Sequence, residues 1–363
     1  MKRSAASPLT KPCLPDLSDN TVRRERTVFA VSCAVLLLLS FLSLTVGSYP
    51  ITVRDLVSAL TGQGDSAAAA VFFRLRLPRV VAGICVGAVL GVTGAVCQTV
   101  FDSPLASPDL TGVASGASVG AAVAVVTGIS SGWGKMGLAF VSGLCALGFL
   151  LLLVRIAGGN GTTGGRRGAY LLAGIFISAA ADALLMVLKI LADPERELAA
   201  IEYWTMGSLA AMTWDKALAM LSAALPALVL LFLFSYPTLI LSRGADGARG
   251  VGVDYGLWSA VLLILSTWAV AAVVSAAGVV GFAGLTVPHI AMLLYRRRGG
   301  LYFALCAVLG GGLIVLSDML ARSAVKGAEL PLGIFCIAFA LIPLGILMIR
   351  SCRSSGTGGG DVL

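Results

Sequence analysis

Few ionisable side chains interrupt the apolar stretches of this sequence, and they are the residues best placed to do chemistry. Asp182 lies in the middle of the apolar run 169–191 with no obvious partner nearby in the sequence. Asp318 and Arg322 are four residues apart, so they can pair on one helix face. An ionisable group inside a membrane span is by default a functional candidate. Asp182 is therefore a candidate for a pathway or ion-coupling residue.

Arginines gather just before a long apolar run. Arg74, Arg76 and Arg79 precede it in the string RLRLPR, and Arg322 follows much later. Such side chains can anchor helix ends at the lipid headgroups. They can also form a positive rim that pairs with acidic residues of an external protein, where charge guides orientation and association rate. The sequence leaves both roles open.

The sequence offers little for a metal or catalytic centre. It has one histidine, His289, and eight cysteines without a C-x-x-C pair. The cysteines are typical of small buried hydrophobes, and a lone histidine is better explained as structural than as a metal ligand. Neither a G-x-x-x-x-G-K-[ST] phosphate loop nor a G-x-S-x-G nucleophile motif occurs. We expect no metal and no cofactor, and any ATP would be bound by separate subunits.

The elements that must position these residues are membrane helices. The chain of 363 residues is 58% hydrophobic and 12% charged, unlike a soluble globular domain. Apolar runs of about 20 residues recur, each long enough to cross a bilayer core of roughly 30 Å. The prediction is an all-α polytopic membrane protein of about ten spans. We expect them at 28–47, 78–100, 110–126, 137–154, 169–191, 216–234, 256–276, 281–295, 301–321 and 330–349.

The charge distribution predicts the topology. An even number of spans puts both ends on one side, and most Lys and Arg residues lie in the two tails and in the loops of that side. The positive-inside rule then makes both termini cytoplasmic. We expect a disordered tail over 1–27, a transmembrane domain over 28–349 and a tail over 350–363. The net charge of +8 is explained by these flanks and not by nucleic acid.

Glycines recur at four-residue steps in two ladders. The first is Gly83, Gly87 and Gly91, and the second is Gly112, Gly116 and Gly120. Such ladders let helix backbones approach closely in a bilayer, where packing drives helix association.

The string from Arg74 to Gly120 resembles the start of the FecCD-type permeases, which are membrane subunits of ABC importers for iron–siderophore complexes, haem and cobalamin. The matching positions are Arg76-Leu77-Pro78-Arg79, Gln98, Pro104-Leu105-Ala106, Pro108, Gly112, Gly116 and Ala117. Ser103 stands where the family usually has Asn. Later segments also resemble family motifs: Ala277–Ile290, Ser317–Arg322 and Glu329–Ile334.

The resemblance implies a type II ABC importer permease fold. It assigns Arg76, Arg79 and Arg322 to docking glutamates of an extracytoplasmic substrate-binding protein. It places Ser103 and Leu105 at positions that narrow the cytoplasmic exit of the pathway.

Segment 241–253 resembles the family's coupling segment, two short helices that sit in a groove of the ATPase. The positions assigned to ATPase coupling are Leu241, Gly244, Ala248, Arg249 and Gly252. Ala245 replaces the usual Glu of this segment, and Met292 replaces a usual Arg further on.

The function implied is the permease subunit of an importer for an iron chelate or cobalamin in the bacterial cytoplasmic membrane. Its expected partners are ABC ATPase subunits, a second permease copy or a paralogue, the binding protein and membrane lipid. ATP hydrolysis would belong to the ATPase subunits, so the chain would be no enzyme. The alternative is an ion-coupled secondary transporter that uses Asp182 as its coupling acid.

Overall fold

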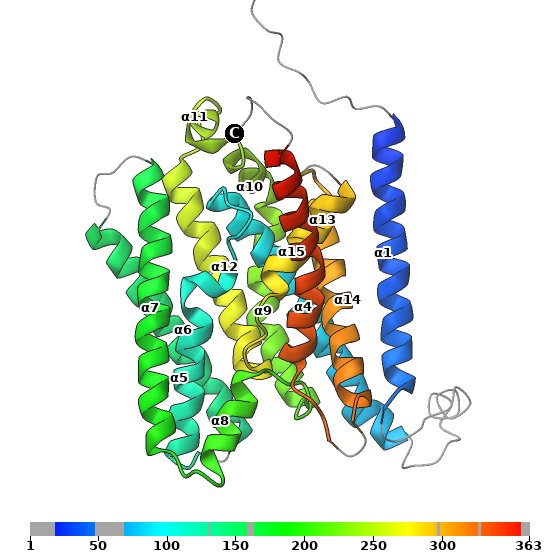
Figure 1. Cartoon of the computed structure of the whole chain (residues 1–363), viewed down its shortest axis with the longest axis vertical. Helices are drawn as coiled ribbons and strands as arrows, with labels where there is room; N and C mark the ends of the chain where they lie inside the picture. The colour runs from blue at the N-terminus through cyan, green and yellow to red at the C-terminus, as the bar shows by residue number, and fades with distance from the viewer. Residues whose placement is uncertain are drawn as a thin grey trace, which may run out of the picture.

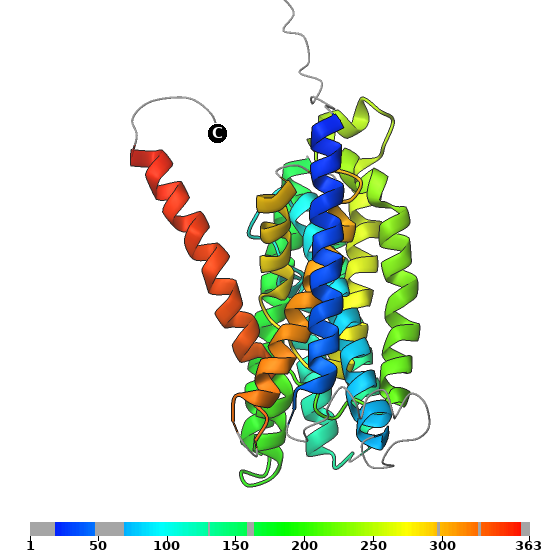
Figure 2. The ribbon, with the colours of Figure 1, turned by 90° about the vertical axis from the view of Figure 1, so that its right-hand side faces the viewer.

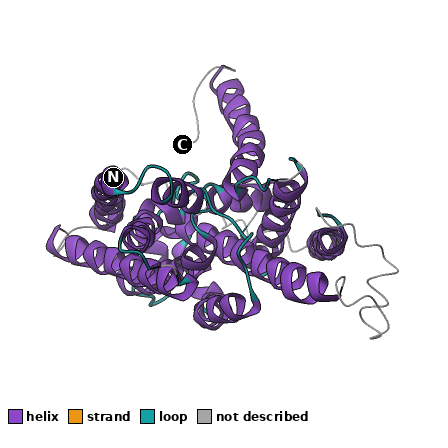
Figure 3. Cartoon of the chain, turned by 90° about the horizontal axis from the view of Figure 1, so that it is seen from below, coloured by secondary structure: helices purple, strands orange, loops and turns teal. Residues whose placement is uncertain are grey.

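The computed structural model describes residues 19–47, 69–129, 131–157, 163–295, 298–325 and 328–356, and these are helices joined by loops (Figure 3). The long helices are α1 (Asp19–Thr45), α4 (Leu77–Val100), α5 (Val113–Val126), α6 (Gly132–Ala157), α7 (Thr163–Leu191), α9 (Trp214–Leu233), α12 (Tyr255–Ala277), α13 (Ala283–Tyr295), α14 (Tyr302–Ser323) and α15 (Leu332–Gly356). Short ones are η1 (Val71–Arg76), η2 (Pro108–Thr111), α8 (Glu197–Thr205), α10 (Ser235–Leu241) and α11 (Gly244–Arg249). The all-α prediction is confirmed.

The number of apolar helices agrees with the number of expected spans. Among the described residues, seven helices are long and apolar enough to cross a membrane. Three shorter apolar helices, Val113–Val126, Ala283–Tyr295 and Leu332–Pro343, complete the set. The long helices lie side by side (Figure 1), and α15 tilts away from the others toward its C-terminal end (Figure 2).

Four helices, α1, α6, α7 and α15, extend five or more residues beyond one end of the expected spans, and the extensions of α1 and α15 are the longest. Helix α1 begins at Asp19 instead of near residue 28, and α15 continues to Gly356. Segment 19–45 contains no Gly or Pro that would end a helix, so the helical conformation continues into its polar turns. The rest of the expected tails, residues 1–18 and 357–363, lies outside the described residues.

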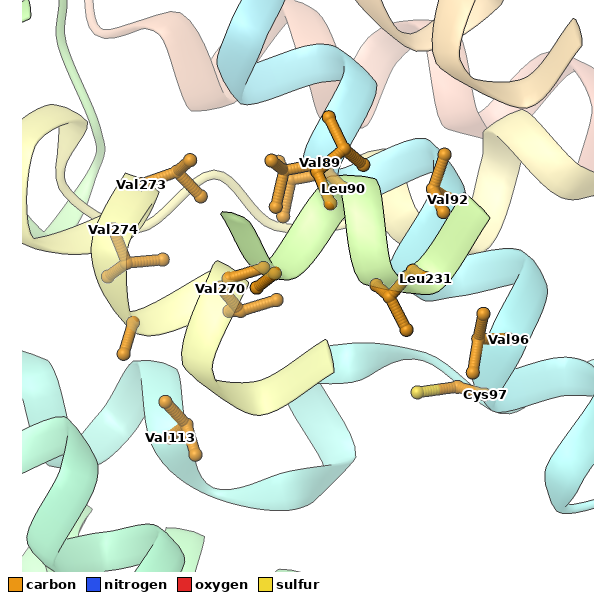
Figure 4. Packing of buried hydrophobic residues seen from close by; sticks show 14 of the residues in the cluster. Val89, Leu90, Val92, Val96, Cys97, Val113, Leu231, Val270, Val273 and Val274 are labelled. Carbon is orange, nitrogen blue, oxygen red and sulfur yellow. The ribbon is translucent and has the colours of Figure 1, made fainter. Parts of the chain in front are cut away.

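Helix α4 is the centre of the packing. It contacts α14, α13, α12 and α9, and most of its side chains are buried. Figure 4 shows valines of α4 beside those of α12, with Leu231 of α9 between the helices. A methyl group added at Gly87 would overlap the carbonyl of Gly310 on α14, and a methyl group added at Gly310 would overlap the carbonyl of Gly87. The close approach expected from the first glycine ladder is therefore present.

Candidate functional site

A buried charged cluster joins the start of α4 to the end of α14. Arg79 donates from Nε to the Asp318 carboxylate, with N–O distances of 2.8 and 3.1 Å. Its two terminal nitrogens donate to Glu329 at 3.1 and 2.9 Å. The side chains of Arg79 and Asp318 are 9% and 4% exposed. Such charge-assisted, fork-like contacts fix both the position and the plane of the guanidinium.

Arg322 is the second arginine of this cluster. Its Nε lies 3.2 Å from Asp318 on the same helix, which confirms the pairing expected from their four-residue spacing. Its Nη2 donates to the carbonyl of Ser43 at 3.1 Å and to the Ser43 hydroxyl at 2.5 Å. Arg322 therefore ties α14 to the last turn of α1.

Arg76 holds the same helix end from another side. Its Nη1 donates to the carbonyls of Leu44 and Thr45, at 2.6 and 2.9 Å. A cation is stabilised there because the last carbonyls of a helix carry partial negative charge. The side chain is buried, as are those of Arg79 and Arg322.

The three arginines that we assigned to docking thus come together, but they point into the chain. Their guanidiniums contact oxygens of α1, α14 and Glu329, so in the isolated chain they hold helices together. Their role in docking a binding protein stays a prediction. The sequence did not indicate Ser43, and it indicated Glu329 only as part of a motif.

The expected coupling segment, 241–253, starts at the last residue of α10 and contains α11, and α10 and α11 are both short helices. They lie at the end of the bundle where α1 starts and α15 ends (Figure 1). The backbone has φ of +81° at Gly244 and +76° at Gly252, a region that glycine adopts without strain. Leu241 and Ala248 are fully buried, whereas Arg249 is exposed. Leu241 and Ala248 therefore pack the segment against the rest of the chain, while the cationic side chain of Arg249 is exposed on its surface.

The two candidate gate residues lie in the loop between α4 and η2. The backbone of Ser103 forms a hydrogen bond on each side. Its amide donates to the Gln98 carbonyl, and its carbonyl accepts from the Ala106 amide. Leu105 is 66% exposed, while Ala106 beside it is buried. The loop is thus held by its backbone and by Ala106, and it leaves Leu105 outside the core.

Asp182 lies on the outer face of α7. Its side chain is exposed, and so are those of Phe176, Leu184 and Met186 along the same helix. Asp182 is not part of the buried charged cluster around Asp318. Its role in a pathway or in ion coupling stays a prediction.

His289 has a structural environment. Its Nδ1 lies 2.7 Å from the Leu285 carbonyl one turn earlier in α13. Gln98 of α4 donates to the same carbonyl at 3.2 Å and lies 3.4 Å from the His289 ring. No group of three metal-binding side chains occurs within the ranges that the structure describes. These contacts support a helix-bridging role for His289.

Comparison with known proteins places this architecture in a family. The profile of the FecCD transport family matches residues 35–350. The helical bundle has the fold of a multi-pass permease of the ABC importer class. This chain belongs to the FecCD transport family.

Relatives of similar length support the assignment. The chain is 34% identical over 333 residues to the vitamin B12 import system permease protein BtuC of Salmonella typhi, covering 91% of this chain and 97% of that one. The BtuC protein of Salmonella arizonae is 33% identical over the same length.

Solved structures agree in fold. An inward-facing metal-chelate type ABC transporter matches with a TM-score of 0.80 and 27% identity, over 90% of this chain and 99% of that one. PsaBC from Streptococcus pneumoniae, in complex with Fab, matches with a TM-score of 0.53 and 17% identity, which shows the fold alone.

Proposed function

We propose that this chain is the permease subunit through which an ABC importer moves cobalamin, or an iron chelate of the siderophore or haem class, across the bacterial cytoplasmic membrane. The observation that carries the proposal is the 34% identity to a vitamin B12 import permease over 97% of that protein. Cobalamin is therefore the first substrate to test.

The arrangement of the sites suggests how the importer would work. Segment 241–253 would contact the ATPase on the cytoplasmic side, through its exposed face with Arg249. Two permease copies, or this chain and a paralogue, would face each other across a pathway bordered by Asp182, with Ser103 and Leu105 at its exit. ATP hydrolysis in the ATPase subunits would move the coupling segments, and the two bundles would then alternate access.

The binding protein would dock at the opposite end, near Arg76, Arg79 and Arg322. A docking carboxylate would compete with Asp318 and Glu329 for these guanidiniums, because both acids already hold Arg79. Docking would thereby loosen the contact between α4 and α14 at the outer end of the bundle.

The test is a substrate panel on the assembled importer. The permease is co-expressed with an ATPase and a binding protein from the same organism, and the complex is placed in liposomes. Cobalamin, a ferric siderophore and haem are compared for ATPase stimulation and for uptake that depends on the binding protein. We expect one of these classes to stimulate both. An assembled complex that takes up none of the three would contradict the proposal.

A further inference from the structure

Helix α1 is fastened to the bundle at its two ends. At its C-terminal end, Arg76 and Arg322 donate to the carbonyls of Ser43, Leu44 and Thr45. At its other end, the Tyr295 hydroxyl donates to the Glu25 carbonyl at 3.0 Å. Figure 1 shows α1 standing beside α14 at the edge of the molecule.

Between these two attachments lies an apolar groove of about 480 Å³. One wall is α1 from Thr27 to Leu39, and the other is formed by α13 and by α14 up to Leu316. The lining hydroxyls of Thr27 and Ser32 donate to carbonyls one turn earlier in α1. The groove therefore has an almost wholly apolar wall, and its occupant must be long and apolar.

The bilayer supplies such an occupant. The groove runs along a helix that is long and apolar enough to span the membrane, and only 11% of that apolar stretch is buried within the chain. Water is excluded at this depth because it would find no hydrogen-bonding partners on such a wall. A lipid acyl chain is as apolar as the lining leucines and valines, so it can fill the space without a desolvation cost.

Positive charge lies at one mouth of the groove. Arg23 and Arg24 are exposed, and they precede Thr27 and Val28 by one helical turn, on the same face of α1. Glu25 is the acidic residue of this turn, and its backbone carbonyl is held by Tyr295. Arg298 follows α13 at the same end and is partly exposed. Basic pockets between membrane helices bind anionic lipid headgroups.

We propose that this groove is a binding site for an anionic phospholipid. One acyl chain lies between α1 and α14, and the phosphate pairs with Arg23 and Arg24. The lipid replaces side-chain packing that α1 lacks along its middle, so it holds α1 against the bundle. This inference requires only that the chain spans a membrane, so it does not depend on the transported substrate.

The experiment uses the full chain in nanodiscs that contain equal amounts of phosphatidylglycerol and phosphatidylcholine. Lipid retained after extraction into detergent is measured by native mass spectrometry. We expect wild type to retain phosphatidylglycerol in preference to phosphatidylcholine, with retention falling as salt concentration rises, because exposed charge pairs are screened. Equal retention of the two lipids by wild type would overturn the proposal.

Two kinds of variant distinguish binding of the lipid headgroup from binding of its acyl chain. The pair Arg23→Gln and Arg24→Gln should lower phosphatidylglycerol retention by roughly tenfold, and Arg23→Lys with Arg24→Lys should restore it. Gly312→Leu should abolish retention by filling the groove, since a Cβ there meets only Leu39 at 3.8 Å.

A matched control removes two exposed arginines at the same end of the bundle, Arg155→Gln with Arg243→Gln. It should retain phosphatidylglycerol as wild type does. Equal loss in this control, or undiminished retention by Gly312→Leu, would show that the lipid is held elsewhere. If a variant does not fold, the lipid preference and salt dependence of wild type still decide the question.

Discussion

At the scale of single residues, Asp318 connects the charged cluster. Its carboxylate accepts from Arg79 and lies 3.2 Å from Arg322, and its side chain is 4% exposed. A buried ion pair adds little net stability compared with a well-packed apolar pair, because desolvation offsets the attraction. Removal of one partner is different, since it leaves a buried charge without compensation.

Asp318→Asn should therefore destabilise the protein by about 3–5 kcal/mol, because it leaves Arg79 and Arg322 close together with one acid fewer. Thermal unfolding in detergent, followed by native tryptophan fluorescence, measures the change. Asp182→Asn is the matched control, since Asp182 is exposed and should change stability by less than about 0.5 kcal/mol. Equal melting temperatures for the two variants would contradict the structural role of Asp318.

The sequence predicted part of this cluster. The pairing of Asp318 with Arg322 follows from helix geometry, because residues four apart share a face. The contact between Arg79 and Glu329 joins residues 250 positions apart, and no local pattern encodes such a distance. The burial of the arginines was missed for the same reason, since it depends on where α1 ends in space.

At the scale of elements, the packing of α4 on α14 depends on glycine at their crossing. Gly87→Ala should destabilise the protein by about 1–3 kcal/mol or more, because the new methyl would overlap the Gly310 carbonyl. The loss should appear as a lower melting temperature and a lower yield of monodisperse protein.

Gly148→Ala on α6 serves as the control, because a methyl there meets nothing within 4 Å. Alanine also has the better helix propensity, by about 1 kcal/mol. This variant should be neutral or slightly more stable. A stable Gly87→Ala protein would mean that α4 and α14 lie further apart than the structure shows.

The coupling segment permits a prediction of its own. Arg249→Ala should leave folding unchanged, because the side chain is exposed, and it should reduce ATPase co-purification or substrate-stimulated hydrolysis several-fold. Arg196→Ala, an exposed arginine outside this segment, should change neither quantity. Wild-type levels of ATPase co-purification and of substrate-stimulated hydrolysis in the Arg249 variant would show that this residue does not contribute to the contact with the ATPase.

The elements themselves were well predicted because hydrophobic length determines them. The expected span 169–191 ends with α7 but starts six residues after it, and 256–276 differs from α12 by one residue at each end. Helix ends in polar sequence were harder, as α1 and α15 show, because both helices continue through polar residues beyond the apolar run that defined the expected span. The sequence did not predict which helices pack against each other, because an apolar side chain indicates that it is buried but not which helix it contacts.

At the scale of the whole molecule, the chain is a helical membrane permease of the FecCD family. The described residues form one bundle of apolar helices, with a charged cluster at one end and the coupling segment at the other (Figure 1). In the function proposed above, energy from ATP would arrive through contacts with separate ATPase subunits, and the sequence contains no phosphate-binding loop of its own. The motifs predicted a permease of the FecCD family, and the family match over residues 35–350 confirms that assignment.

The most direct measurement is uptake of labelled substrate into liposomes that contain this chain with or without its ATPase subunits. We predict uptake only when the ATPase subunits, the binding protein and ATP are all present, and none from an ion gradient acting on the permease alone. Gradient-driven uptake by the permease alone, lost in Asp182→Asn, would contradict the account and would establish an ion-coupled secondary transporter instead.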